Sequence, residues 1–261
     1  MTHANPNNPS PAEMLGIDVR NARLAWGDAV LLDDFSFSAP AGSWTCLLGE
    51  SGVGKSTLLR TIAGLIDPVA PTEIHAHDGT ELHARVAYMA QQDLLLPWLS
   101  AIDNVALGAR LRGERADKDR ALDILAHAGV AERANALPSE LSGGERQRVA
   151  LARTLMEERP VVLMDEPFSA LDAITRTRLQ DLAVDLLENR TVLMVTHDPF
   201  EALRLADTIF VLSDNELPTH APIVPAGPTP RDPTDPALRE SHRTIMQRLT
   251  DGATRTAGGP A

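Results

Sequence analysis

A nine-residue loop, GESGVGKST at positions 49–57, constrains the fold of this chain more than any other feature of its sequence. The loop lies between a continuous apolar run, WTCLL at 44–48, and a stretch with helical spacing, STLLRTIAGL at 56–65. Glycines let backbone N–H groups curl around phosphate oxygens, and the helix that follows presents its positive N-terminal end to them. The order strand, glycine loop, helix therefore predicts a phosphate-binding P-loop in an α/β fold.

Two side chains of the loop have specific expected roles. We expect Lys55 to reach the β- and γ-phosphates of a nucleotide and the Ser56 hydroxyl to ligate Mg²⁺. The alternative is a glycine turn without function, which the flanking strand and helix disfavour. The residues expected to bind the nucleotide here are Gly49, Glu50, Ser51, Gly52, Val53, Gly54, Lys55, Ser56 and Thr57.

Two further apolar runs end in residues that complement a P-loop. VVLMDEP at 161–167 reads as a buried strand that ends in Asp165, where a carboxylate holds Mg²⁺ through water. Glu166 is expected to point the other way and to activate the attacking water. The alternative is an acidic pair at a helix N-terminus, which the presence of a P-loop in the same chain disfavours. VLMVTHD at 192–198 repeats the pattern, and His197 is expected to donate a hydrogen bond to a γ-phosphate.

A second short segment, LSGGERQR at 141–148, is also built to meet an anion. Ser142 and Glu145 form an S-x-x-E capping box, which by itself predicts no more than a well-capped helix start. That interpretation leaves Gly143 and Gly144 unexplained, because a glycine in a helix costs up to about 1 kcal/mol relative to alanine. Paired glycines at a helix N-terminus are expected where an anion approaches the backbone closely.

The first loop already surrounds the phosphates of its own nucleotide. The second segment is therefore expected to serve the γ-phosphate of an ATP bound to another copy, so that two copies placed head-to-tail enclose two ATP molecules. SALD at 169–172 follows Glu166 closely, and Asp172 is expected to contact the partner across that interface.

The rest of the chain alternates strand and helix patterns. Residues 17–26 and 35–38 alternate apolar and polar side chains, as half-exposed strands do. Short apolar runs at 85–89, 161–164, 191–195 and 208–212 are typical of strands in a sheet covered on both faces, and weak strands are expected within 69–84. Residues 93–158 have helical spacing, which predicts a helical insert. A disordered leader is expected at 1–14, and a proline-rich tail that becomes helical at 238–249 is expected from 217 to 261.

Composition limits the classes of function. The formal net charge of −12 argues against a nucleic-acid partner, which a basic surface would attract. The single cysteine, Cys46, lies in an apolar run and is expected to be a buried core residue. No apolar run approaches the roughly 20 residues that span a bilayer, and the N-terminus lacks a secretory pattern, so a soluble cytosolic protein is expected.

Taken together, GESGVGKST, LSGGERQR, VVLMDEP, SALD and VTHD occur in an order that resembles the nucleotide-binding subunits of ABC transporters. The resemblance covers about residues 15–216. It implies a P-loop NTPase core with a parallel sheet, an antiparallel β subdomain and an inserted α-helical subdomain. It also implies ATP with Mg²⁺, ATP hydrolysis, an ATP-dependent dimer and attachment to separate membrane subunits.

Further residues take a role only from this resemblance. Trp26 occupies the position of an aromatic that stacks on adenine, although tyrosine is commoner there and a core or edge aromatic is the alternative. Gln91 resembles the glutamine that ligates Mg²⁺ and links the core to the helical lobe. Gln92 is the alternative, and the spacing to LLPW favours Gln91. Ala90 departs from the phenylalanine that many relatives have, which concerns local packing.

LLLPW at 94–98 is the expected docking point for a membrane permease, within the segment Gln91–Trp98. The alternative is insertion into the core of the helical lobe. LLPW at this place looks like the importer subunits for nitrate, sulfonates, taurine and thiamine precursors.

The leading hypothesis is therefore an ATPase peripheral to the cytoplasmic face of the inner membrane, coupled to permeases and indirectly to a solute-binding protein. The alternatives are a soluble ABC ATPase acting on nucleic acid or ribosomes, an ABC exporter subunit, and a small-molecule kinase. A kinase of that kind would have no use for LSGGERQR.

Overall fold

The computed structural model describes residues 14–26, 29–82, 84–212 and 221–256. Nearly all of the expected leader, and residues 217–220 and 257–261 of the expected tail, lie outside the described residues. At Trp26, Ala29 and 252–256 only the backbone is described.

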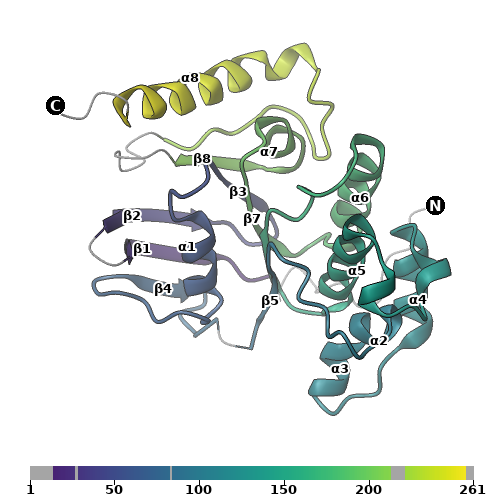
Figure 1. Ribbon diagram of the computed structural model, residues 1–261. Coiled ribbons are helices and arrows are strands. Elements are labelled where there is room, and N and C mark those ends of the chain that lie inside the picture. The colour runs from purple at the N-terminus through teal and green to yellow at the C-terminus, as the bar shows by residue number, and fades with distance from the viewer. Residues whose placement is uncertain (1–13, 27–28, 83, 213–220, 257–261) are drawn as a thin grey trace.

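A five-stranded parallel sheet forms the centre of the molecule, with strand order β5-β6-β7-β3-β8 (Figure 1). Three of its strands are buried at every position, which explains why they read as continuous apolar runs in the sequence. The strands are β3 (Trp44–Gly49), β5 (Val86–Met89), β6 (Val161–Asp165), β7 (Thr191–Thr196) and β8 (Thr208–Leu212).

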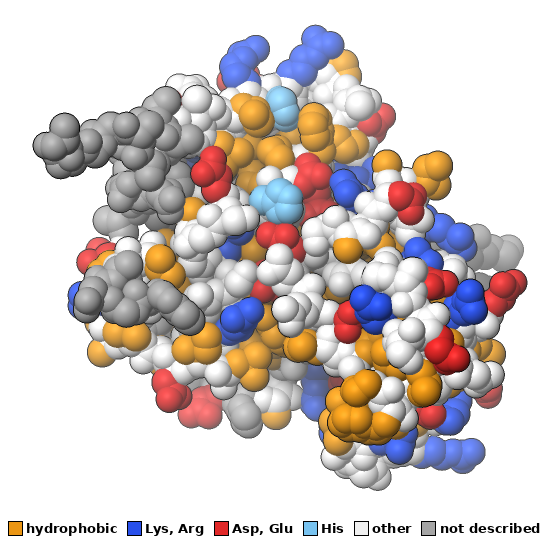
Figure 2. Space-filling view, in the orientation of Figure 1, with side chains coloured by type: hydrophobic (Ala, Val, Ile, Leu, Met, Phe, Trp, Pro, Cys, Tyr) orange, Lys and Arg blue, Asp and Glu red, His pale blue; other side chains and the backbone are white. Residues whose placement is uncertain are grey.

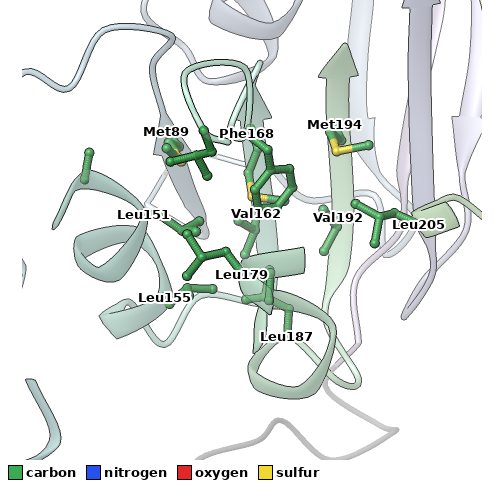
Figure 3. Packing of buried hydrophobic residues seen from close by; sticks show 14 of the residues in the cluster. Met89, Leu151, Leu155, Val162, Phe168, Leu179, Leu187, Val192, Met194 and Leu205 are labelled. Carbon is green, nitrogen blue, oxygen red and sulfur yellow. The ribbon is translucent and has the colours of Figure 1, made fainter. Parts of the chain in front are cut away.

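Alternate side chains of these strands feed two separate hydrophobic clusters. Leu47, Leu163 and Leu193 point to one face, where helix α1 (Lys55–Ile62) and the antiparallel sheet pack. The opposite face carries the larger cluster, which Figure 3 shows with Val162 and Met194 surrounded by side chains from the helices. Cys46 belongs to this second cluster and is buried, as predicted.

The antiparallel sheet has the order β2-β1-β4 and lies beside α1 (Figure 1). Its strands are β1 (Ile17–Trp26), β2 (Ala29–Ala39) and β4 (Glu73–Ala76). Buried and exposed residues alternate along much of β1 and β2, as the sequence pattern predicts. Together with the helical insert described next, this arrangement confirms the predicted α/β class with its β subdomain.

The helical insert lies to one side of the parallel sheet (Figure 1). It contains α2 (Ala101–Val105), α3 (Leu107–Leu111), α4 (Lys118–His127) and α5 (Gly143–Met156), with short 3-10 turns at Ala131–Arg133 and Pro138–Glu140. The helical spacing over 93–158 does not indicate that α2 and α3 are separate helices. The break falls at Ala106, whose ψ of 3° departs from helical values.

Two helices follow the insert on the larger cluster's side, and a third closes the chain. They are α6 (Ala173–Leu186), α7 (Pro199–Leu205) and, after a 3-10 turn at Pro236–Leu238, α8 (Arg239–Thr256). The ring of Phe200 on α7 stacks on His242 of α8 with centroids 5.1 Å apart. Hydrophobic side chains gather where these two helices meet (Figure 2). Among the described helices, none is both long enough and apolar enough to cross a membrane.

Candidate nucleotide site

The glycine loop connects the end of β3, which lies between β7 and the edge strand β8 of the parallel sheet, to the start of α1. Gly54 precedes the helix with φ of 93°, a left-handed conformation that side chains rarely adopt. A Cβ there would also lie 3.2 Å from Cβ of Leu31. At Gly49 a Cβ would lie only 2.2 Å from the carbonyl oxygen of Leu212 on β8. Both glycines are therefore required by backbone geometry and by packing.

The ammonium group of Lys55 is held at the base of the loop. Lys55 is only 4% exposed, and its Nζ donates to the carbonyl oxygens of Gly49 at 2.8 Å and Glu50 at 2.5 Å. These bonds hold the positive charge against the loop backbone. Val53 is buried in the core below, so any part it takes in ligand binding comes from its backbone.

A cavity of about 200 Å³ opens beside the loop and brings together residues from four parts of the chain. Its lining comprises Leu31, Ser51, Gly52, Gly54, Lys55, Ser56, Thr57, Gln91 and Glu166. A neighbouring groove of about 520 Å³ is lined by Gly49, Glu50, Ser51, His197, Pro199, Met246, Leu249 and Thr250. No feature of the sequence predicted that Leu31 or helix α8 would border these spaces.

Asp165 lies at the carboxyl end of β6 and meets the loop directly. Ser56 Oγ donates to Asp165 Oδ1 at 2.8 Å, whereas the buried Oδ2 has no hydrogen-bond partner within the described part of the chain. Burial raises the pKa of Asp165 above its usual value, and the hydrogen bond from Ser56 and the charge of Arg60 act in the opposite direction. A cation beside this carboxylate would offset the cost of burying its charge.

Glu166 follows Asp165 and receives contacts from two other elements. Gln91 Nε2 donates to Glu166 Oε2 at 3.4 Å, and Nδ1 of His197 lies 3.2 Å from Glu166 Oε1. The Glu166 side chain is 12% exposed and its φ is 48°, an uncommon value for a residue with a side chain. Its N–H donates to the carbonyl oxygen of Val195 at 2.9 Å, which holds this strained backbone against β7. Glutamine, glutamate and histidine thus converge at the edge of the cavity.

The second glycine segment forms the N-terminus of α5. Ser142 Oγ accepts from the N–H of Glu145 at 3.3 Å, and Glu145 Oε2 accepts from the N–H of Ser142 at 2.7 Å, so the capping box is present. The nearest atoms to a Cβ on Gly143 or Gly144 would lie 3.8 Å away or more. Packing within the chain therefore does not require either glycine.

Asp172 caps α6 by accepting from the N–H of Thr175 at 3.0 Å. These backbone hydrogen bonds lower the pKa of Asp172. Neither Asp172 nor the glycine segment at 142–144 lines the two spaces beside the P-loop. Within one chain, these residues do not complete the nucleotide site.

The segment Gln91–Trp98 has features of both predicted alternatives, docking to a permease and insertion into the core of the helical lobe. Leu95 is buried in the large cluster, as the core interpretation requires. Leu94 and Trp98 are 59% and 71% exposed, as a docking surface requires. Trp26 ends β1, opposite Ala29, and its side chain lies outside the described residues, so its predicted stacking role remains a prediction.

Three polar residues near the site were not predicted from the sequence. Arg146 and Arg153 of α5 both bind Asp93 in the segment Gln91–Trp98, which we call the docking segment. Their spacing of seven residues puts them on one helix face, and this spacing could have indicated a shared partner. Glu201 on α7 is 5% exposed and accepts from Gln180 Nε2 at 3.3 Å. A lone glutamate in an amphipathic helix gives no sequence signal of burial.

Comparison with known proteins agrees with this geometry. The family described as ABC transporter matches residues 32–169. An uncharacterized ABC transporter ATP-binding protein from Haemophilus influenzae is 43% identical over 240 residues, covering 89% of this chain and 98% of that protein. An aliphatic sulfonates import ATP-binding protein from Paracoccus denitrificans is 40% identical, covering 89% of this chain and 93% of that protein.

Solved structures give the same result. A dimeric ATP-binding cassette in a post-hydrolysis state with ADP and Pi has a TM-score of 0.70 and 29% identity, covering 81% of this chain and 99% of that one. Sequence and structure thus agree over most of the chain, including the nucleotide loop. The chain belongs to the ABC transporter family and is an ATPase of that family.

Proposed function

We propose that this ATPase is the energy-supplying subunit of a membrane importer, and that it works as a head-to-tail dimer. The observation that carries the proposal is the convergence of Gln91 and His197 on Glu166, beside the P-loop lysine and the Ser56–Asp165 pair. A protein that binds a nucleotide without hydrolysing it does not need a carboxylate held by two polar neighbours beside the P-loop.

The chemistry follows from the residues around the cavity. The loop N–H groups and Lys55 bind the phosphates, because they concentrate positive charge at a helix N-terminus. Glu166 accepts a proton from the attacking water as the water oxygen bonds to the γ-phosphorus, the bond from that phosphorus to the β–γ bridging oxygen breaks, and ADP leaves. His197 contacts the γ-phosphate and positions it relative to Glu166. Trp26 stacks on the adenine base.

The residues also suit Mg²⁺, which prefers hard oxygen ligands. Ser56 Oγ, the Asp165 carboxylate and the Gln91 amide oxygen form such a set, and the unpartnered buried Oδ2 of Asp165 supports it. Mg²⁺ bound there would neutralise charge on the phosphates. The bound Mg²⁺ would in turn keep the buried carboxyl group of Asp165 in its charged form.

The partner copy completes each nucleotide site. Ser142, Gly143 and Gly144 would present a helix N-terminus to the γ-phosphate across the interface, and Asp172 would contact the partner. The open space at both glycines supports this, since no atom of the described residues excludes a side chain there. The dimeric form of the solved cassette with ADP and Pi supports it as well.

The docking segment supplies the contact with a permease. Leu94 and Trp98 offer exposed apolar surface, and buried Leu95 anchors the segment to the helical insert. Relatives named as aliphatic sulfonate import proteins support an importer of the sulfonate, nitrate, taurine and thiamine-precursor group. The chain would then be peripheral to the cytoplasmic face of the inner membrane, with a solute-binding protein delivering the nutrient to the permease.

Subunit mixing tests the shared site. Lys55→Ala disables the P-loop, and Gly143→Asp places a negative charge where the partner's γ-phosphate would lie, so each variant alone is expected to be inactive. In a mixed pair, one site keeps Lys55 from one copy and Gly143 from the other. We expect equimolar mixing to restore about a quarter of the wild-type rate, because about half of randomly formed pairs are mixed.

A mixture as inactive as its two components would contradict the proposal, provided that Gly143→Asp still binds ATP. Full activity of Gly143→Asp alone would contradict it too, since the site would then be complete within one chain. Circular dichroism of both variants checks that neither result comes from misfolding.

A further inference from the structure

The start of the docking segment is held by two arginines from α5, the helix whose N-terminus carries Ser142–Gly144. Arg153 donates from Nη1 to the carbonyl oxygen of Leu94 at 2.9 Å and from Nη2 to that of Asp93 at 2.7 Å. The guanidinium of Arg153 thus binds two successive carbonyl oxygens of the docking segment. A guanidinium offers this fork of donors, whereas a lysine ammonium offers only a point charge.

Arg146 also binds Asp93, from the same face of α5 as Arg153. Its Nε donates to Asp93 Oδ2 at 2.9 Å, and its Nη1 donates to the carbonyl oxygen of Leu141 at 2.9 Å. Arg146 therefore connects the docking segment to the residue just before the capping serine. The two arginines together tie Asp93 to both the first part and the last turn of α5.

The backbone of Leu94 indicates that these contacts hold a fixed shape. Leu94 has φ of 45°, a left-handed conformation that costs a residue with a side chain roughly 1–2 kcal/mol. Such a conformation persists where surrounding contacts over-determine it. Its carbonyl oxygen is bound by Arg153, and its side chain is directed to solvent.

The far end of the segment is braced separately. The buried Asn104 accepts from the N–H of Leu96 at 2.8 Å and donates to the carbonyl oxygens of Leu96, Leu99 and Ser100. Arg153 and Asn104 therefore fix the two ends of the exposed apolar stretch. At its beginning, Gln91 reaches Glu166 in the nucleotide site.

We propose that Arg153, assisted by Arg146, is a positioning residue that joins the docking segment to α5, so that the permease contact and the glycine segment at 142–144 move as one body. The proposal rests on the function proposed above and adds the residues that transmit the motion. Through Gln91, the same fork sets the distance between the docking segment and Glu166.

Replacing the fork with a point charge tests this. We expect Arg153→Lys, in the full-length chain, to increase hydrogen exchange of the amides at 91–98 about fivefold or more, with the loop at 49–57 unchanged. We also expect kcat for ATP to fall about tenfold, because Gln91 loses its position, while KM stays within about twofold. Arg153→Met should give the same changes more strongly.

Arg112→Lys is the matched control. Arg112 is another arginine of the helical insert, but its partners are the carboxylates of Glu114 at 3.0 Å and Glu157 at 2.6 Å. We expect this variant to leave exchange at 91–98, kcat and KM as in wild type.

Unchanged exchange at 91–98 in Arg153→Lys would overturn the proposal, as would increased exchange there with kcat unchanged. Increased exchange throughout the chain, with a lowered melting temperature, would show a merely structural role and overturn it too. The exchange measurement needs no dimer or permease. Failure of the proposed dimer would therefore appear in the mixing experiment and would leave the exchange result for Arg153→Lys unaltered.

Discussion

The carboxylate of Glu166 is held by its neighbours rather than by solvent, and this makes its role testable by a nearly isosteric change. In Glu166→Gln the amide keeps the shape of the side chain but no longer accepts a proton from water. We expect turnover to fall about 10²- to 10⁴-fold, the range typical of a lost general base, with ATP affinity retained. Steady-state ATPase assays and equilibrium nucleotide binding measure the two quantities. Turnover within a few-fold of wild type would exclude Glu166 as the base.

A second carboxyl, that of Glu201, governs how stability responds to pH. Burial raises the pKa of Glu201 from 4.5 to about 7, and hydrogen bonds from Thr196 and Gln180 oppose this only in part. Between those two values the folded chain holds a proton that the unfolded chain releases. This contribution to stability is therefore complete below about pH 4.5 and is lost as the pH rises to about 7.

Glu201→Gln removes that dependence, because an amide does not titrate. We expect the variant to be more stable than wild type at pH 8, by on the order of 3 kcal/mol, and equally stable near pH 4. Urea denaturation at several pH values measures the difference. Glu240→Gln, an exposed residue of α8, is the control. Parallel stability curves for wild type and Glu201→Gln would contradict the prediction.

Prediction from sequence at this scale depended on whether a residue belongs to a contiguous motif. The Ser56–Asp165 hydrogen bond joins two motifs that the sequence analysis had already connected by strand topology. Arg153 and Glu201 escaped prediction because their partners are backbone carbonyls and a buried amide far away in the chain. The seven-residue spacing of Arg146 and Arg153 predicts that they share a helix face, but it does not identify the groups that they bind.

Among the elements, α5 offers a test that separates stability from function. Gly143 lies in its first turn, and a Cβ there would lie 3.9 Å from a side-chain nitrogen of Arg146. We expect Gly143→Ala to fold normally and to unfold at a higher temperature, since alanine favours a helix by up to about 1 kcal/mol over glycine. ATPase activity should nevertheless fall, because the methyl group meets the partner's nucleotide.

Calorimetry and ATPase assays on the same preparation give both readouts. A more stable variant with full activity would remove Gly143 from the nucleotide contact. Gly54→Ala provides the contrast, because its φ of 93° makes a side chain strained there whatever the space.

The elements themselves were predictable in proportion to how completely they are buried. Strands β3, β6 and β7 are buried throughout and appear as continuous apolar runs. The four-residue β4 carries only one buried residue, Ala76, so its pattern within 69–84 was weak. The break between α2 and α3 was missed because Ala106 is a good helix former, and the ψ of 3° found there is not encoded in its residue type.

At the scale of the whole molecule, the proposed dimer requires each chain to contribute to two different nucleotide sites. The P-loop, Asp165 and Glu166 meet around one cavity, whereas the glycine segment of α5 and Asp172 lie outside it. Sequence reasoning predicts such a division, because a second anion receptor has no purpose inside a chain that already has one, and the mixing experiment tests it. The groove beside α8 was not foreseen, since the tail's apolar spacing gave no indication of where it would pack.

A dimer closed by ATP makes thermal stability depend on protein concentration. In Glu166→Gln, where ATP persists, we expect the melting temperature with Mg²⁺ and ATP to rise by about 2 °C for each tenfold increase in protein, because association stabilises the folded pair by mass action. With ADP in place of ATP, binding to single chains should raise the melting temperature without that dependence. Adding Gly143→Asp should leave the stabilisation by ATP but remove the effect of concentration, since the nucleotide still binds the P-loop while the partner no longer accepts it. Equal dependence on protein concentration with ATP, with ADP and in the doubly substituted chain would mean that the copies associate through a surface unrelated to the nucleotide.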